Sequence, residues 1–413
     1  MKLTKLIISW LAITVSVFAQ NEAVSCAGCH QELDQPLNAP VELFADDVHS
    51  VAGFNCTICH GGDPEAWDYD EAKSEKAGFI GVPAGVGIIE VCSKCHSNPQ
   101  FMRTYNPNMP TDQEAKYWTS GHGASLKQGN VDMATCVSCH DVHGIRKKND
   151  PAASVYHANV DITCGRCHSD RQLMGKYGLP FESVGQYRAS VHGIALLEKG
   201  DLAAPTCNNC HGNHGAAPPA LGSIQEVCGT CHVKNQALFN GTVMHTVFLE
   251  NDIHGCAACH TAHAIIHPSE AMIGVAAPGI CGSCHADGDP GAQIGDGIKA
   301  ALNELNDELE AAETAVKLAE QQGLETENLI FDIQNGHTSL VQSRTTVHSF
   351  DLDQVTESTG PGLAIARAVI LGVDELIADF RWRRIGLGIA TIMISFLAIV
   401  LYLYIRAIEK KPN

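Results

Sequence analysis

The feature that most constrains this chain is a five-residue motif, Cys-x-x-Cys-His, which occurs nine times and accounts for all 18 cysteines. The cysteines are Cys26, Cys29, Cys56, Cys59, Cys92, Cys95, Cys136, Cys139, Cys164, Cys167, Cys207, Cys210, Cys228, Cys231, Cys256, Cys259, Cys281 and Cys284. The histidines that follow them are His30, His60, His96, His140, His168, His211, His232, His260 and His285. Two thiols on one turn can bond the vinyl groups of a porphyrin, and the adjacent imidazole can bind its iron as the proximal ligand. The sequence therefore predicts nine covalently bound haem c groups.

Zinc sites and disulfides are the two alternative uses of so many cysteines. Zinc is held by paired Cys-x-x-Cys units, and an exported chain commonly joins its cysteines in pairs. Neither use requires a histidine directly after every second cysteine, and no cysteine lies outside the nine motifs. The pattern favours haem attachment over both.

The spacing of the motifs indicates how the interior is filled. They lie between Cys26 and His285, so each haem has only about 29 residues of chain, too few to bury a large macrocycle alone. Only 6% of the residues are aromatic. We expect a mostly α and irregular multihaem cytochrome c with a haem-filled core, followed by a C-terminal helical hairpin and one transmembrane helix.

Twelve further histidines are candidates for the second, distal ligand of each iron. A longer repeat aligns Trp118-Thr-Ser-Gly-His122-Gly with Arg188-Ala-Ser-Val-His192-Gly. A rough first copy of this repeat has His49 before Cys56, and three motifs continue as Cys-x-x-Cys-His-x-x-His. The distal candidates favoured by these recurring positions, and by position after the last motif, are His49, His122, His143, His192, His214, His245, His263 and His348. The second choices are His157, His254, His267 and His337. The alternative for each is an ordinary surface or interior histidine.

Helix geometry limits what His143 can bind. If the chain is helical there, the His140 and His143 side chains share one face, with Cβ atoms about 5–6 Å apart. His143 then cannot reach the far side of the haem held by His140. We expect it to bind the iron of a neighbouring haem, and the same holds for His214 and His263.

Beyond Asp289 the composition changes to that of long helices. A first helix is predicted from apolar positions spaced by four and three residues, namely Ile298, Leu302, Leu305, Leu309, Ala312, Val316 and Ala319. Gly323 should end it, and a second helix would place Ile330, Ile333, His337, Leu340, Arg344 and Val347 on its seam. Pro361 suits the first turn of a third helix that continues into the membrane. Because the last motif has no histidine left in its repeat, we expect His348 to bind the Cys281 haem, with His337 as the alternative.

The two ends predict export and a membrane anchor. Residues 1–19 have the form of a signal peptide, with Lys2 and Lys5 before an apolar run and a small-residue cleavage site at Ala19; an uncleaved anchor is the alternative. Residues 385–405 carry no charge and are long enough to cross a bilayer once. We expect a single-pass protein of the cytoplasmic (inner) membrane with its haem domain in the periplasm. The predicted domains are residues 1–19 (signal peptide), 20–290 (nonahaem domain), 291–380 (helical hairpin and stalk), 381–407 (transmembrane helix) and 408–413 (cytoplasmic tail).

Several segments around the fifth and sixth motifs carry a family resemblance. They include Lys176-Tyr-Gly-Leu-Pro180, Ser190-Val-His192-Gly and Cys207-Asn-Asn-Cys210-His211-Gly-Asn-His214. The haem region resembles the periplasmic multihaem cytochromes c encoded beside, or fused to, membrane cytochrome b subunits in anaerobic respiratory chains. The resemblance implies electron transfer between the quinone pool and periplasmic carriers, with a membrane cytochrome b or other quinone-reactive subunit as a partner. The helical tail is similar in layout to that of multihaem nitrite reductases and hydroxylamine oxidoreductases.

Charge narrows the partners further. The chain has 27 Lys and Arg against 46 Asp and Glu, a net charge of −19, which excludes a nucleic-acid surface as the first interpretation. A soluble partner, such as a periplasmic cytochrome or reductase, should present a basic patch. The main alternative is an oxidoreductase with one open-site haem for nitrite, hydroxylamine or sulfur-oxyanion chemistry. A haem-carrying scaffold or filament is a third interpretation.

Overall fold

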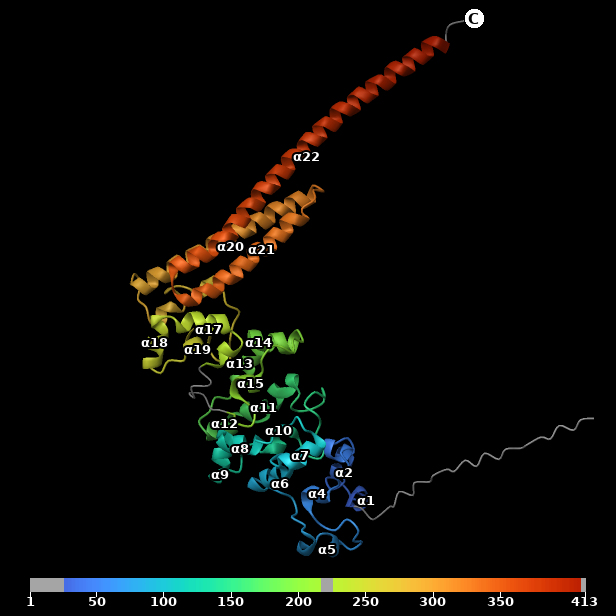
Figure 1. Cartoon of the computed structure of the whole chain (residues 1–413), viewed down its shortest axis with the longest axis vertical. Coiled ribbons are helices and arrows are strands. Elements are labelled where there is room, and N and C mark those ends of the chain that lie inside the picture. The colour runs from blue at the N-terminus through green and yellow to red at the C-terminus, as the bar shows by residue number, and fades with distance from the viewer. Residues whose placement is uncertain (1–25, 217–225, 410–413) are drawn as a thin grey trace, which may run out of the picture. The chain divides into compact units, whose positions relative to one another are not determined.

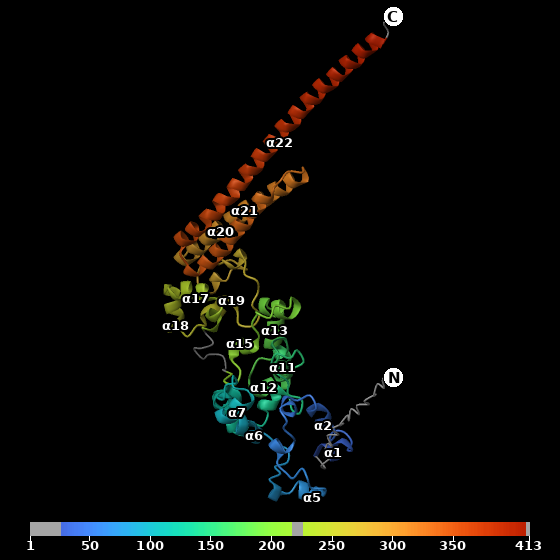
Figure 2. The same ribbon diagram turned by 45° about the vertical axis from the view of Figure 1, so that its right-hand side comes forward.

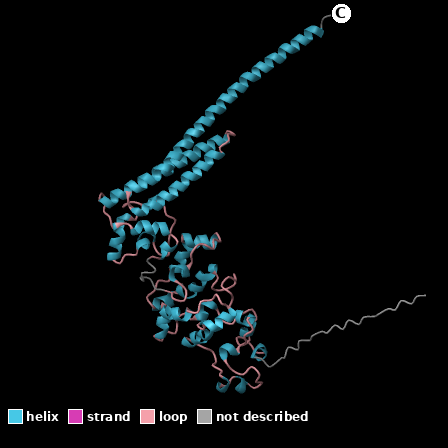
Figure 3. Cartoon of the chain, viewed as in Figure 1, coloured by secondary structure: helices cyan, strands magenta, loops and turns pink. Residues whose placement is uncertain are grey.

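The computed structural model describes residues 26–216 and 226–409. The predicted signal peptide and residues 410–413 of the predicted tail lie outside this part of the chain. The described residues form helices joined by irregular segments, and none of them lies in a strand (Figure 3). The predicted fold class, mostly α and irregular, is confirmed.

Short helices fill the chain before residue 217. They are α1 (Cys26–Gln31), α2 (Ala39–Phe44), α3 (Val48–Val51), α4 (Thr57–His60), α5 (Tyr69–Ala72), η1 (Glu75–Ala77), α6 (Val86–His96), α7 (Pro99–Tyr105), α8 (Gln113–Thr119), α9 (Gly121–Lys127), α10 (Cys136–His140), η2 (His157–Asn159), α11 (Val160–His168), α12 (Arg171–Lys176), α13 (Ser183–Ala189), α14 (Val191–Gly193), η3 (Ile194–Glu198) and α15 (Cys207–His211). After residue 225 follow η4 (Val227–Thr230), α17 (Val233–Asn240), α18 (Val243–Glu250), α19 (Gly255–His260), η5 (Glu270–Met272), η6 (Cys281–Ser283), α20 (Pro290–Gln321), α21 (Glu327–Thr346), η7 (Val347–Ser349) and α22 (Leu352–Glu409).

The chain divides into two compact units. The first comprises residues 1–188 and 192–218, and the second comprises residues 189–191 and 219–413. Six of the motifs lie in the first unit, and the last three lie in the second together with the long helices (Figure 1). The division expected at residues 290, 380 and 407 stays a prediction.

The sequence repeat of the first unit is also a structural repeat. The hydroxyl of Tyr117 donates to the carbonyl of Ala134, and that of Tyr187 donates to the carbonyl of Pro205. A capping box then begins each following motif helix, at Thr135 in one copy and at Thr206 in the other. Equivalent short helices therefore present the motifs in both copies.

A regular polypeptide core is found in the helical tail. Asp289 caps α20 by accepting from the backbone N–H of Ala292, and Pro290 occupies the first turn. Gly323, with a φ of +78°, ends the helix in the left-handed conformation that favours glycine. The predicted stripe from Ile298 to Ala319 is buried against α21 and α22, which lie alongside α20 in both views (Figures 1 and 2). The first predicted tail helix and its seam are confirmed.

The seam of the second tail helix differs from the prediction. Ile333 and Leu340 are buried as expected, but the residues between and after them on that face are Gly336, Ser339 and Ser343. His337 and Arg344 point elsewhere, and they pair with Glu313 and Glu270. Small side chains occupy this face because α22 passes close by: a Cβ on Gly362 would lie 3.0 Å from the Cβ of Ser339.

Helix α22 runs without a break from the stalk into the apolar segment. It starts at Leu352, so Pro361 lies inside the helix rather than in its first turn as predicted. Its first part packs in the tail core through Val355, Ala366, Val369 and Val373. From residue 381 onward every described residue is exposed, and α22 is the one described helix long and apolar enough to cross a membrane.

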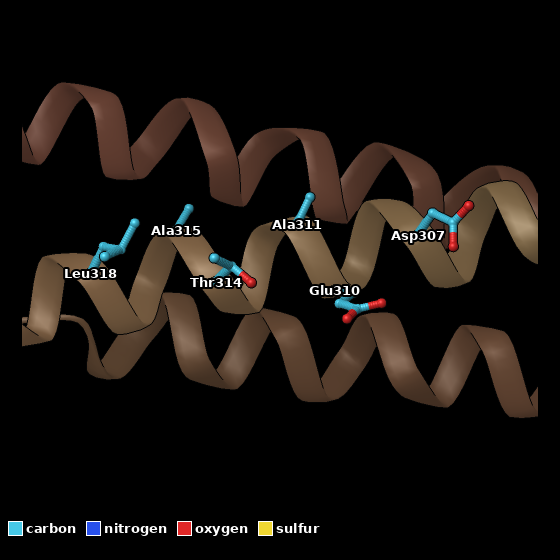
Figure 4. Close-up of a pocket in the computed structure, with 6 residues that line it drawn as sticks. All are labelled: Asp307, Glu310, Ala311, Thr314, Ala315 and Leu318. Atoms are coloured by element: carbon cyan, nitrogen blue, oxygen red, sulfur yellow. The ribbon is translucent and has the colours of Figure 1, made fainter.

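A groove of about 500 Å³ lies along α20, away from the motifs. Figure 4 shows that the six lining side chains, from Asp307 to Leu318, all belong to this helix. They offer two carboxylates, one hydroxyl and short apolar groups, with no cysteine or histidine among them. The groove therefore has no part in the haem-binding geometry described next.

Candidate haem-binding sites

Each motif lies on a single helical turn, which orients its thiols together. Six motifs lie wholly within α-helices, namely those of α1, α6, α10, α11, α15 and α19. In the second motif Cys56 caps α4, and the seventh and ninth begin in the 3₁₀ turns η4 and η6. Residues i, i+3 and i+4 share one face of a helix. The turn therefore presents two sulfurs and one imidazole to the same side, as covalent haem attachment requires.

Five motif histidines face a second imidazole from another part of the chain. The ring centroids are 6.1 Å apart for His49 and His96, 5.9 Å for His60 and His143, 6.0 Å for His122 and His168, 6.1 Å for His140 and His214, and 6.1 Å for His260 and His348. An imidazole nitrogen binds a first-row metal at about 2 Å, so two ligands on opposite sides of one ion place their centroids roughly 6 Å apart. The five pairs fit an iron between their rings.

In several of these histidines a hydrogen bond is made by Nδ1, which leaves Nε2 available to bind a metal. The Nδ1–H of His60 donates to the carbonyl of Gly81, and that of His348 donates to the carbonyl of Thr345. The Nδ1 of His49 lies 2.8 Å from a carboxylate oxygen of Asp47. A carbonyl or carboxylate can only accept, so the lone pair of each ring is on Nε2. This is the usual arrangement of a metal-binding histidine.

Burial also favours the neutral, metal-binding form of the paired rings. Burial lowers the pKa of each of eight paired histidines below the ordinary value, and in several the pKa is lowered further by a neighbouring imidazole. They are His96, His122, His140, His143, His168, His214, His260 and His348. Metal binding requires the unprotonated ring, and the lowered pKa values favour that form near neutral pH.

His348 does not face the motif for which it was predicted. Its ring lies opposite His260 of the eighth motif, whereas His285 of the ninth motif is hydrogen bonded to Asp289. The alternative, His337, directs its Nε2 to the carboxylate of Glu313. The prediction failed because it used closeness in sequence, whereas the turn η7 brings His348 back to α19.

As predicted, His143 does not face His140 of its own motif. The reason differs from the predicted one, because the two residues do not lie on one continuous helix. Helix α10 ends at His140, and Asp141 and His143 have φ values of +64° and +61°. The backbone therefore turns away after the motif, and His143 stands opposite His60 of the second motif. His214 likewise stands opposite His140.

The remaining histidines have varied surroundings. His157 uses Nε2 to donate to the carbonyl of Ala204, so that nitrogen is occupied. His245 packs edge-on against Phe239, His254 caps α19, and the exposed His267 donates to its neighbour's carbonyl. In the first motif, the Nδ1–H of His30 donates to the carbonyl of Leu37. Four further histidines, His192, His211, His232 and His263, also take part in interactions.

Successive motifs lie next to each other within each unit. Thiols of successive motifs influence each other's pKa in four pairs, Cys26 with Cys56, Cys92 with Cys136, Cys164 with Cys207, and Cys228 with Cys256, so the two thiols of each pair lie close together. Electrostatic interactions join Cys59 to Cys95, Cys139 to Cys167, and Cys259 to Cys281. The attachment points of the first six motifs, and of the last three, therefore follow one another in sequence order.

The geometry does not favour the alternative uses of cysteine. No disulfide joins any of the 18 cysteines, all of which lie in the described residues, and no three metal-ligating side chains gather into a cluster within residues 26–216 and 226–409. Tetrahedral zinc sites need four such ligands. The two thiols of one motif, together with an imidazole pair, fit the attachment and ligation of haem instead.

Asp47 is a site residue that sequence reasoning missed. Its side chain is 1% exposed and holds the His49 ring. The signal was its position two residues before a repeated histidine, where two other copies have Ser120 and Ser190.

Comparison with known proteins relates the chain to multihaem cytochromes. Residues 48–178 match the family model of cytochrome c3. This segment contains the second to fifth motifs and three of the five histidine pairs. Over 281 residues the chain is 25% identical to the multiheme cytochrome MtrA of Shewanella baltica (strain OS185), covering 65% of this chain and 68% of that protein. No solved structure matches. The chain is thus similar to multihaem c-type cytochromes, which implies covalently bound c-type haems and a role in electron transfer.

Proposed function

We propose that this chain is a nine-haem cytochrome c that carries electrons between the membrane quinone pool and periplasmic redox partners. The observation that carries the proposal is the set of five imidazole pairs, each joining a motif histidine to a distant histidine about 6 Å away. Each motif would bind one haem through its two cysteines. The bound haem supplies a one-electron iron couple.

The protein's own part would be to hold the iron of these five motifs from both sides and to exclude other ligands. The distal ligands would be His143 for the second motif, His49 for the third, His214 for the fourth, His122 for the fifth and His348 for the eighth. With an imidazole on each side of the iron, these haems would have no open position and would transfer electrons without binding substrate. Within each unit, the neighbouring thiols of successive motifs would keep adjacent haems close enough to exchange electrons.

The first unit buries few large apolar side chains, which supports a haem-filled interior. Its one buried apolar cluster among the described residues consists of Ile89, Tyr117 and Leu126 with a few flanking groups. The tail, by contrast, has a continuous core of aliphatic residues. A unit with so few buried apolar side chains needs another hydrophobic component in its interior, and haem would provide it.

Helix α22 would anchor the protein in the cytoplasmic membrane as a single span, with the haem region in the periplasm. Its exposed segment, residues 385–405, is uncharged, and Trp382, Tyr402 and Tyr404 suit the membrane–water interfaces. A signal peptide at residues 1–19 would direct export. Ending the chain after Arg384 should release the protein from membranes with an unchanged haem spectrum; a truncated chain that still sediments with membranes would contradict this anchor.

The partners would follow from charge and topology. One span cannot carry electrons across the bilayer, so a membrane cytochrome b or other quinone-reactive subunit would complete the path. The net charge of −19 would attract a periplasmic cytochrome or reductase with a basic patch, and added salt should weaken that association.

Three measurements on the purified full-length protein test the proposal. Mass spectrometry should show nine haems, electron paramagnetic resonance (EPR) should show low-spin ferric haem, and the protein with its native associates should oxidise menaquinol. A bare or disulfide-bonded polypeptide would reject the haem assignment. A high-spin haem that binds carbon monoxide would favour the alternative, an oxidoreductase with one open site.

A further inference from the structure

Asp47 places a buried carboxylate against the imidazole that faces the third motif. One oxygen lies 2.8 Å from the Nδ1 of His49 and also accepts from the His49 backbone N–H at 2.8 Å. The second oxygen accepts from the backbone N–H of Ile145 at 2.6 Å. All three donors are N–H groups, so the carboxylate acts as an acceptor throughout.

The same carboxylate also reaches the segment that carries His143. The backbone N–H of Val48 donates to the carbonyl of Ile145, and Asp47 accepts from the N–H of that same residue. Asp47 interacts electrostatically with His143 and with Cys59 of the second motif. It therefore lies between the ligand sets of the second and third motifs, with its closest contact on His49.

The other copies of the repeat have no carboxylate at this position. Ser120 begins α9 two residues before His122, and its hydroxyl caps the helix at Gly123 while donating to the carbonyl of Tyr117. Backbone pairing is kept in both copies: Gly121 donates to the carbonyl of Ala216 just as Val48 donates to that of Ile145. The capping role needs only a serine, so the buried charge of Asp47 is an addition specific to the first copy.

We propose that Asp47 is a positioning residue that lowers the reduction potential of the haem attached at Cys92 and Cys95. The inference rests on the proposed haem ligation by His49 and His96. A carboxylate that accepts from the ring N–H increases the basicity of the ligand. Both this effect and the buried negative charge stabilise ferric over ferrous iron, and little water is present to screen the charge. Asp47 would therefore give the third haem a lower potential than the same haem would have with a serine at this position, as at Ser120, two residues before His122.

The test compares midpoint potentials in the full-length, haem-loaded protein. Redox titration followed by EPR would be performed on the native protein, on D47N, which removes the charge at nearly constant shape, and on D47S, which introduces the residue of the other copies. D46N is the matched control, because the Asp46 side chain is 78% exposed and pairs with Arg146. Haem content is measured first in every sample.

Both Asp47 variants should retain low-spin haem and shift one low-spin component to a higher potential, whereas D46N should leave every component in place. If the D47N protein fails to accumulate, the potentials of D47S alone test the proposal, since the second copy already has a serine at this position, Ser120. A full set of low-spin haems with no potential shift in D47S would overturn the proposal while leaving the proposed function intact. Conversion to high-spin iron would show that Asp47 only keeps His49 in place, which also overturns it. A native protein without haem would instead reject the proposed function.

Discussion

At the scale of single residues, the ring nitrogen that is already hydrogen bonded distinguishes two of the paired histidines from two other ligand candidates. His60 and His348 use Nδ1 for a backbone carbonyl and keep Nε2 free. His157 and His337 use Nε2, for a carbonyl and a carboxylate. Recurrence in the sequence cannot show this difference, because it depends on which acceptor the fold places beside each ring.

Replacing His348 with alanine should convert one haem from low spin to high spin. The reason is that His348 faces His260, so its removal leaves that iron with one imidazole. EPR of the oxidised protein measures the change, and H337A is the control expected to show none. In a chain whose Cys256 and Cys259 are both alanine, H348A should have no further effect; a new high-spin signal there would assign His348 to another haem.

At the scale of elements, the tail helices pack through small residues rather than through the aliphatic seam alone. A Cβ on Gly362 would lie 2.8 Å from a methyl group of Leu305, and one on Gly336 would lie 2.5 Å from a methyl group of Leu309. Glycine at these positions lets α20, α21 and α22 approach closely. A heptad pattern read from the sequence finds the aliphatic positions but does not reveal this close approach.

The substitution G362A should destabilise the tail by about 1–3 kcal/mol, because the added methyl group overpacks a filled core. G360A is a matched control on the same helix: nothing lies within 4 Å of its added Cβ, and it should stabilise by about 0.5–1 kcal/mol. Hydrogen exchange of α22 amides measures both effects. Equal protection in the two variants would show that the helices are not in close contact at Gly362.

The ion pair between Arg344 and Glu270 should make the stability of the second unit depend on pH. Burial raises the pKa of Glu270, but the hydrogen bonds from Arg344 and from the backbone outweigh it and leave the pKa below its ordinary value. A lowered carboxyl pKa stabilises the fold above the unfolded value, and this stability is lost as pH falls through the folded value. R344A should therefore cost about 1 kcal/mol near neutral pH.

Below the folded pKa of Glu270 the difference between R344A and the native protein should vanish. Hydrogen exchange of α21 amides at several pH values measures it. The control is R367A, since Arg367 joins Glu304 and Glu308 on the exposed surface and should contribute little at any pH. A loss that stays constant with pH would contradict the role of the Glu270 charge.

At the scale of the whole molecule, two kinds of interior occur in one chain. The tail is stabilised by an aliphatic core from Ile298 to Val373. The motif-bearing segments have short helices and partly or fully exposed cysteines, and their interior would depend on the groups that we propose the cysteines bind. Loss of haem should therefore destabilise the motif-bearing segments and leave the stability of the helical tail unchanged.

Preventing haem attachment should unfold the first unit and leave the tail helices formed. Alanine at all 18 cysteines removes the attachment points without touching the tail core. Limited proteolysis should then cut throughout residues 26–216, while fragments containing α20, α21 and α22 persist. Equal resistance of the first unit with and without haem would show that its polypeptide packs by itself.

The sequence alone determined what is local along the chain. Thiols three residues apart with an adjacent imidazole form one helical turn, so the motif residues could be named without a structure. The aliphatic stripe of α20 and the uncharged stretch of α22 are likewise patterns of neighbouring residues, and the mostly α fold followed from them.

Only the tertiary structure decided which histidines face each other. The imidazoles that face His60, His96 and His260 come from segments more than 40 residues away. The turn at residues 347–349 places His348 opposite His260 rather than opposite His285, its predicted partner. The buried contact of Asp47 with Ile145 spans a similar distance in sequence. Attachment depends on side chains within one turn, whereas pairing across an iron depends on how distant turns pack, which spacing along the chain does not specify.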